Sequence, residues 1–191
     1  MYPTTVEMKS FFKTRTKRHI DLVKKYWDKI QGLVNTDGRD IQLHDNSKFL
    51  PPEFIPYIHL TWMYKTKGSP DEYIMPDSLA RKVHEATFHH VMHNDHHPEY
   101  WDSSILNNPV NFEDRDAHGG VVIDAREMPE DAIAEMCSDW MAMSEEKGNS
   151  PIDWARANIP SRWKFSDDQE KLIYRLLKAG WTKRETGSAM E

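Results

Sequence analysis

Apolar residues recur at three- and four-residue steps along most of this 191-residue chain, and no segment alternates apolar and polar residues convincingly. Steps of three and four place side chains on one face of an α-helix, whereas strict alternation is typical of a half-buried β-strand. The pattern therefore predicts an all-α fold. With 38% apolar residues the chain can bury one sizeable core, so we expect a single compact helical domain over residues 1–180 and a tail over 181–191.

Start and stop signals divide the chain into helices. A capping box at Thr4–Glu7 predicts the start of a long helix that continues to about Val34. Further helices are expected from Pro51 to Gly68 with an irregularity at Pro56, from a cap at Asp77 or Ser78 through His90, from Pro129 to Gly148, around Asp153–Ala157, and from Ser166 to Gly180. Residues 101–125, rich in asparagine, aspartate and glycine, are expected to form an extended loop.

Composition narrows the classes of function. The formal charge is −6, with 31 acidic against 25 basic residues, which argues against an extended nucleic-acid surface. No apolar run approaches the roughly 20 residues that span a bilayer, and the N-terminal residues lack a signal-peptide pattern. The single cysteine, Cys137, excludes an intramolecular disulfide and suits a reducing compartment. We therefore expect a soluble cytoplasmic protein, which leaves its oligomeric state open.

Histidine is the unusual component. Six of the ten histidines fall within fourteen residues: His84, His89, His90, His93, His96 and His97. His19, His90 and Asp139 occupy positions on the apolar faces of three expected helices, where a polar group is costly unless it meets a partner. The adjacent pair His44-Asp45 can bind one cation or bridge two. A shared metal ion would satisfy all of these side chains.

The ordered set resembles the HD-domain superfamily of metal-dependent phosphohydrolases, whose members are all-helical. Three longer strings are similar to those of an uncharacterised family found in bacterial and phage genomes: HDNSKF (44–49), NDHHPEYW (94–101) and EMCSDWMAM (135–143). The resemblance covers the chain from His19 to Met143. If the protein is encoded by a phage, the expected cytoplasmic location is the cytoplasm of the host cell.

The resemblance also implies a ligand set, position by position. The ligands of a first metal ion would be His19, His44, Asp45 and Asp139, with Asp45 able to bridge to a second ion. The extra histidines of the two-metal members are matched by His90, His96 and His97, although His90 lies nearer to the paired histidines than in the best-understood of those members. The expected cofactor is one or two divalent ions, and Mn, Mg, Co, Fe and Zn all remain open.

The implied reaction is hydrolysis of a small phosphoester by metal-activated water, because a bound divalent cation lowers the pKa of its water from 15.7 to about 7. Lys48 matches a position where many superfamily members have a lysine beside the phosphate. Arg15, one turn before His19, is a second cation for the phosphoryl oxygens. Glu99, and His97 if it is not a ligand, are candidate proton donors for the leaving group.

A nucleotide is the favoured substrate on the superfamily resemblance and on one aromatic residue. Trp101 follows the histidine cluster directly and offers a stacking surface for a base, although aromatic residues at helical spacing usually mean packing. Asn94 and Tyr100 are candidates for the wall of the same pocket.

Three alternatives remain open. Some HD-domain proteins hold two irons and cleave C–C or C–P bonds with dioxygen, and the metal identity would discriminate this oxygenase from a hydrolase. A nuclease centre of the HNH type would use Asp95-His96-His97-Pro98 with Asn107, Asn108, Asn111 and His118, but it requires two strands and a basic surface. A non-catalytic protein would have a closed metal shell. The histidines left as structural or exposed are His59, His84, His89, His93 and His118.

Overall fold

The structure, a computed structural model, describes residues 2–107 and 121–181. Its α-helices are α1 (Val6–Ile30), α2 (Phe54–Thr66), α3 (Asp77–His93), α4 (Glu130–Lys147), α5 (Pro151–Arg162) and α6 (Asp167–Gly180). Short 3-10 helices are η1 (Gln31–Leu33), η2 (Ile41–Leu43), η3 (Asn46–Phe49), η4 (Pro98–Trp101) and η5 (Ser103–Asn107). The two strands, β1 (Ile123–Asp124) and β2 (Trp163–Lys164), pair in parallel with Ile123 opposite Trp163. The mostly helical architecture confirms the predicted fold class.

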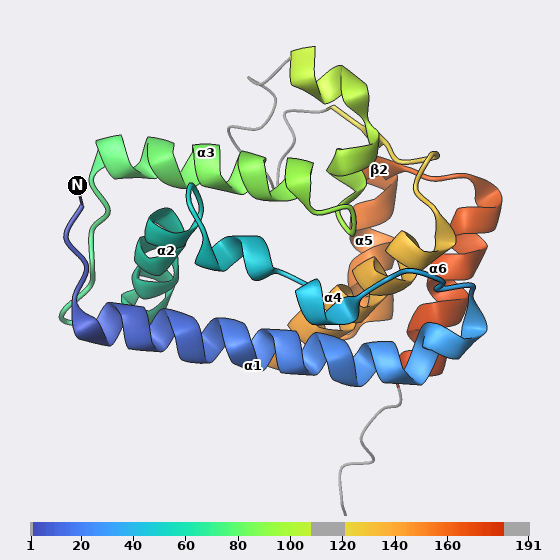
Figure 1. Ribbon diagram of the computed structural model, residues 1–191, viewed down its shortest axis with the longest axis horizontal. Helices are drawn as coiled ribbons and strands as arrows, with labels where there is room; N and C mark the ends of the chain where they lie inside the picture. The colour runs from blue at the N-terminus through green and yellow to red at the C-terminus, as the bar shows by residue number, and fades with distance from the viewer. Residues whose placement is uncertain (1, 108–120, 182–191) are drawn as a thin grey trace, which may run out of the picture.

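The helices enclose the segment that carries η2 and η3. Figure 1 shows α1 along one long side of the molecule and α3 along the other, with α2 between them at one end and α4, α5 and α6 grouped at the other end. The chain from α1 to α2 passes through the space between α1 and α3 (Figure 1). This route brings residues 41–49 into the middle of the fold.

Two apolar clusters stabilise this arrangement. The larger cluster joins the second half of α1 with α4, α5 and α6, and the smaller cluster joins the start of α1 with α2 and α3. On α1, Phe12 belongs to the smaller cluster and Val23 to the larger one, and buried His19 lies between them. The polar residues described below therefore occupy the junction of the two apolar clusters.

Helix α1 starts one residue later than predicted. Thr5 is the N-cap, and its hydroxyl accepts a hydrogen bond of 3.1 Å from the backbone N–H of Met8. Glu7 is then the second helical residue and not the third, so the predicted capping box at Thr4 is wrong. A capping box needs the acidic side chain at the third position in order to reach back to the cap.

Two further details of the helix prediction are wrong. The N-cap of α3 is Pro76, which makes no side-chain capping bond, while Asp77 and Ser78 lie inside the helix. Pro56 causes no break in α2, because it is the third helical residue and the first four N–H groups of a helix have no intrahelical partner in any case.

Other predicted signals are confirmed. Gly148 ends α4 with a φ of +69°, in the left-handed region, and Ser166 forms a capping box with Gln169 at the start of α6. Helix α5 is longer than the short helix predicted around Asp153–Ala157. The predicted loop is partly helical at η5, and residues 108–120, like 182–191 of the predicted tail, lie outside the described residues. Among the described residues, no helix is long and apolar enough to cross a membrane.

Candidate metal centre

Asp45 is the centre of a buried polar cluster. It lies between η2 and η3 with a φ of +59°, a left-handed conformation that aspartate adopts more readily than most residues. Its side chain is only 2% exposed. The turn presents the carboxylate to side chains from α1, α3 and the segment after α3, so each of its two oxygens faces a different group of histidines.

One group faces Oδ2 of Asp45 and comes from α1, the η2 turn and α4. Nε2 of His19 lies 3.9 Å and Nε2 of His44 lies 3.8 Å from this oxygen. Oδ1 of Asp139, on α4, lies 2.9 Å from Nε2 of His19. We call His19, His44 and Asp139 the Oδ2 group.

The second group faces Oδ1 of Asp45 and comes from the end of α3 and the following turn. Nε2 of His90 lies 3.1 Å and Nε2 of His96 lies 3.9 Å from this oxygen. The ring of His97 lies 4.3 Å from that of His96 between centroids, and its ligand atom falls within the same buried set. We call His90, His96 and His97 the Oδ1 group, and Asp45 with both groups the Asp45 cluster.

The outward nitrogens of three of these histidines contact buried carboxylates. Nδ1 of His44 and Nδ1 of His96 lie 2.8 and 3.2 Å from Oε1 of Glu135. Nδ1 of His90 lies 2.9 Å from Oε2 of Glu53. Metal-binding histidines almost always donate the other ring N–H to such a partner, which fixes the ring and its tautomer.

The inward nitrogens supply the test of whether a metal ion fits. The Nε2 atoms of His44 and His96 are buried and make no hydrogen bond, and an unsatisfied buried polar atom costs about 1–3 kcal/mol. Imidazole and carboxylate donors together suit divalent Mn, Fe, Co and Zn. The donor set of the Asp45 cluster therefore fits a divalent cation.

The electrostatics set the protonation state of each of these side chains. Burial opposes ionisation of Asp45, yet Lys48 and the adjacent histidines hold the pKa of this carboxyl well below its usual range. Burial lowers the pKa of His44, which favours the neutral imidazole that metals bind. Burial also disfavours protonated His19, but the nearby carboxylates of Asp139 and Glu146 outweigh it and raise the pKa of His19 to about 9, so a cation must displace the proton of this residue.

The two predicted phosphate contacts lie at different distances from the cluster. Nζ of Lys48 donates a hydrogen bond to Oδ2 of Asp45, and the lysine side chain is 21% exposed. Nη2 of Arg15 lies 3.7 Å from Oε2 of Glu146, which also lies 3.6 Å from Nδ1 of His19. Lys48 is thus in direct contact with Asp45, whereas Arg15 is separated from His19 by Glu146.

The structure places the other predicted site residues in supporting contacts. The amide of Asn94 donates to the backbone oxygen of His90 at 2.7 Å and to Oγ of Ser47 at 3.0 Å, which ties the end of α3 to η3. The indole of Trp101 donates to the backbone oxygen of Asp95 at 2.8 Å and packs against the larger apolar cluster. Glu99 is buried and accepts a hydrogen bond of 3.2 Å from Nε1 of Trp163.

Three residues of this region were missed at the level of sequence. Glu135 had a detectable signal, because it precedes Asp139 by one helical turn and shares its face. Glu53 and Arg39 had no such signal in the sequence, because their partners are far away along the chain.

A hollow of about 510 Å³ lies beside the Asp45 cluster. Arg39, Glu135, Asn94 and Tyr100 are among the residues that line it.

The remaining histidines do not join the Asp45 cluster where the structure describes them. Nδ1 of His89 lies 2.7 Å from Oε1 of Glu53, and its ring stacks on that of His93. His59 is buried and contacts the hydroxyl of Tyr73 at 2.9 Å. His118, with Asn108 and Asn111 of the alternative nuclease motif, lies outside the described residues.

Comparison with known protein families gives one result. Residues 8–179 match the model of DUF5662, a family of unknown function. The chain belongs to the DUF5662 family. The match runs from α1 to α6 and so includes the whole Asp45 cluster. No curated protein and no solved structure matches the chain. What a DUF5662 protein does must therefore be argued from the residues themselves.

Proposed function

We propose that this DUF5662 protein is a divalent-metal-dependent phosphohydrolase that acts on a small phosphoester. The observation that carries the proposal is the convergence of histidine Nε2 atoms from separate elements on the two oxygens of one buried aspartate, Asp45. The Nε2 atoms of His44, His90 and His96 are buried without a hydrogen bond, although buried polar groups of a protein core are usually hydrogen-bonded. A pair of cations, one beside each oxygen, would give every one of these nitrogens a partner.

The two groups define two proposed metal positions. The ligands of the first position would be His19, His44, Asp139 and Oδ2 of Asp45. The ligands of the second position would be His90, His96, His97 and Oδ1 of Asp45. When bound, two neighbouring cations supply an activated water molecule and stabilise negative charge on the attacking and leaving oxygens. The order of these ligands along the chain is also the basis of the resemblance to HD-domain phosphohydrolases.

Lys48 is what favours a phosphate ester as the substrate. Its ammonium group lies against Asp45 and is partly exposed, so it can contact an incoming phosphoryl oxygen without first losing its position. Stabilising the charge on those oxygens is the main task in phosphoryl transfer. Arg15, paired with Glu146 and 43% exposed, would add positive charge at the rim.

A nucleotide remains the favoured substrate class, and the support for it is now the resemblance alone. The indole of Trp101 is held by the backbone of Asp95 and packs against the larger apolar cluster, which leaves less of it for stacking on a base. The acidic composition of the chain agrees with a small substrate and not with an extended nucleic acid.

The test is release of inorganic phosphate from a panel of nucleotides and simple phosphomonoesters, with Mn²⁺, Mg²⁺ or Co²⁺ added to metal-stripped protein. The parent chain is compared with Asp45→Asn and with His84→Asn, a half-buried histidine of α3 outside the Asp45 cluster. We expect turnover in the parent and in His84→Asn and none in Asp45→Asn. If the iron-loaded protein consumes oxygen and releases phosphate from none of the substrates, the result would contradict the hydrolase and favour a di-iron oxygenase.

A further inference from the structure

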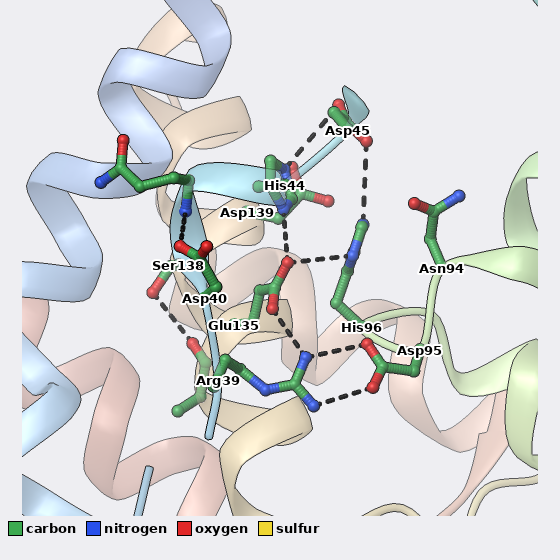
Figure 2. Close-up of polar contacts among 12 residues, drawn as sticks. Arg39, Asp40, His44, Asp45, Asn94, Asp95, His96, Glu135, Ser138 and Asp139 are labelled. Carbon is green, nitrogen blue, oxygen red and sulfur yellow. Dashed lines mark hydrogen bonds and ion pairs between the residues drawn. The ribbon is translucent and has the colours of Figure 1, made fainter. Parts of the chain in front are cut away.

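Glu135 contacts one histidine from each group. Its Oε1 atom lies 2.8 Å from Nδ1 of His44, in the Oδ2 group, and 3.2 Å from Nδ1 of His96, in the Oδ1 group. Figure 2 shows the carboxylate of Glu135 between the two imidazoles and Arg39. The glutamate side chain is 6% exposed, so water does not compete strongly for these contacts.

Arg39 holds this glutamate in place. Its Nη1 donates to Oε2 of Glu135 at 2.7 Å, and its two terminal nitrogens bind Asp95 in a bidentate manner at 2.8 and 2.9 Å. Its Nε donates to Asp131, one turn before Glu135 on α4, at 2.8 Å. Asp95 directly precedes His96 in the chain. The guanidinium of Arg39 therefore holds both the carboxylate of Glu135 and the residue next to His96, one of the two histidines that Glu135 contacts (Figure 2).

Glu53 provides the comparison, because it contacts only one of the two groups. Its oxygens lie 2.9 Å from Nδ1 of His90 and 2.7 Å from Nδ1 of His89, which lies outside the Asp45 cluster. Ser47 donates to the same carboxylate at 3.0 Å. Both glutamates are buried and both support histidines, but Glu135 alone of the two is shared between the groups.

We propose that Glu135 is a positioning residue that orients one ligand of each metal position at once, and so couples the two positions. The proposal rests on the metal centre proposed above. An imidazole whose Nδ1 is held by a carboxylate cannot rotate its Nε2 away from the ion, and such partners typically contribute 10- to 100-fold to metal affinity. Loss of Glu135 removes a contact of both His44 and His96, whereas among the ligands of the Asp45 cluster loss of Glu53 affects His90 alone.

The test is a titration of metal-stripped protein with Co²⁺, followed by calorimetry and by the visible absorption bands of the bound ion. The parent is expected to take up two equivalents. In Glu135→Gln we expect both binding steps to weaken by about 10- to 100-fold and the bands of both ions to change, because glutamine is uncharged and, with its amide oxygen accepting from Arg39, presents N–H donors instead of an acceptor to Nδ1 of His44 and His96. In the matched variant Glu53→Gln, only one step should weaken.

Two variants assign the steps: His19→Asn removes a ligand of the first position and His90→Asn removes a ligand of the second. The proposal is overturned if Glu135→Gln weakens neither step or only one. If Glu135→Gln does not fold, Glu135→Asp takes its place, because aspartate keeps the charge but has a shorter side chain. Weakening of both binding steps in Glu135→Asp would support the proposal, and weakening of neither or of only one would overturn it. If the parent chain takes up no Co²⁺, the proposed function is overturned as well. If the parent binds Co²⁺ in two steps and Glu135→Gln binds it with the same two affinities, only the coupling is overturned.

Discussion

At the scale of single residues, the account depends on protons and cations competing for the same atoms. His19 lies 2.9 Å from Asp139 and 3.9 Å from Asp45, and the carboxylates around it raise its pKa to about 9. A metal ion at the first position must displace the proton on Nε2 of His19. Metal affinity should therefore depend on pH over a range where an ordinary histidine no longer titrates.

We expect the affinity of the first position for Co²⁺ or Zn²⁺ to rise as the pH increases from about 6.5 towards 9, with close to one proton released from His19 per ion bound there near neutral pH. The sign follows from the raised pKa, because below it the folded, metal-free protein keeps this proton. Calorimetry in buffers of different ionisation enthalpy measures the number released. An affinity that is constant over this range would contradict the assignment of His19 as a ligand.

Lys48 should affect turnover and not metal binding. Asp45, the partner of Lys48, has other contacts and should keep its position without the lysine. A phosphoryl group at the site, however, would lose the ammonium group of Lys48. In Lys48→Ala we expect turnover to fall by about 10²–10³-fold, the usual loss for one transition-state donor. Calorimetry should still give two equivalents of Co²⁺. The control is Lys82→Ala, a change at an exposed lysine of α3 that pairs only with Glu85 among the contacts the structure records.

At the scale of elements, local signals predicted some helix boundaries correctly and misplaced others. Gly148 and Ser166 were read correctly, because a left-handed glycine and a capping box each depend on a few adjacent residues. The start of α1 was misread, because Thr4 and Thr5 are chemically equal as caps and only the register of the helix decides between them.

The corrected start of α1 has a measurable consequence. Thr5→Ala removes the hydroxyl that accepts the N–H of Met8 and should lower the free energy of unfolding by about 1 kcal/mol. Thr4→Ala should change it by less than about 0.5 kcal/mol, because substitutions away from such features have little effect. Urea unfolding of both variants measures the difference. If both changes lowered the free energy of unfolding by the same amount, the assignment of Thr5 as the single N-cap would be contradicted.

At the scale of the whole molecule, the sequence predicted residues that the fold brings together in the Asp45 cluster, but not the residues that support them. His19, His90 and Asp139 could be read from the apolar faces of their helices, and His44-Asp45 from the adjacency of the two residues and the order of the motifs. Arg39 and Glu53 could not, because Arg39 meets Glu135 across 96 residues and Glu53 meets His90 across 37. Such pairs form only once the segment before η2 has packed against α4 and the start of α2 against α3.

The position of the Asp45 cluster between the two apolar clusters gives a prediction about stability. A cation at the first proposed position would join α1 and α4 to the η2–η3 segment, and a cation at the second would join the end of α3 to the same segment. At a free metal concentration 100 times the dissociation constant, the free energy of unfolding should rise by about 2.7 kcal/mol. In a domain of this size that corresponds to a rise in Tm of roughly 5–10 °C. Scanning calorimetry with metal, and then with excess chelator, measures the rise and its reversal.

Metal analysis of the reconstituted, desalted protein decides whether the Asp45 cluster binds divalent cations. Parent chain, Asp45→Asn and the control His84→Asn are loaded with Co²⁺ or Zn²⁺ under the same conditions and compared by elemental analysis. The account predicts up to two ions per chain in the parent and in His84→Asn, and little or none in Asp45→Asn. A parent without metal, or an Asp45→Asn variant that retains as much as the parent, would contradict it.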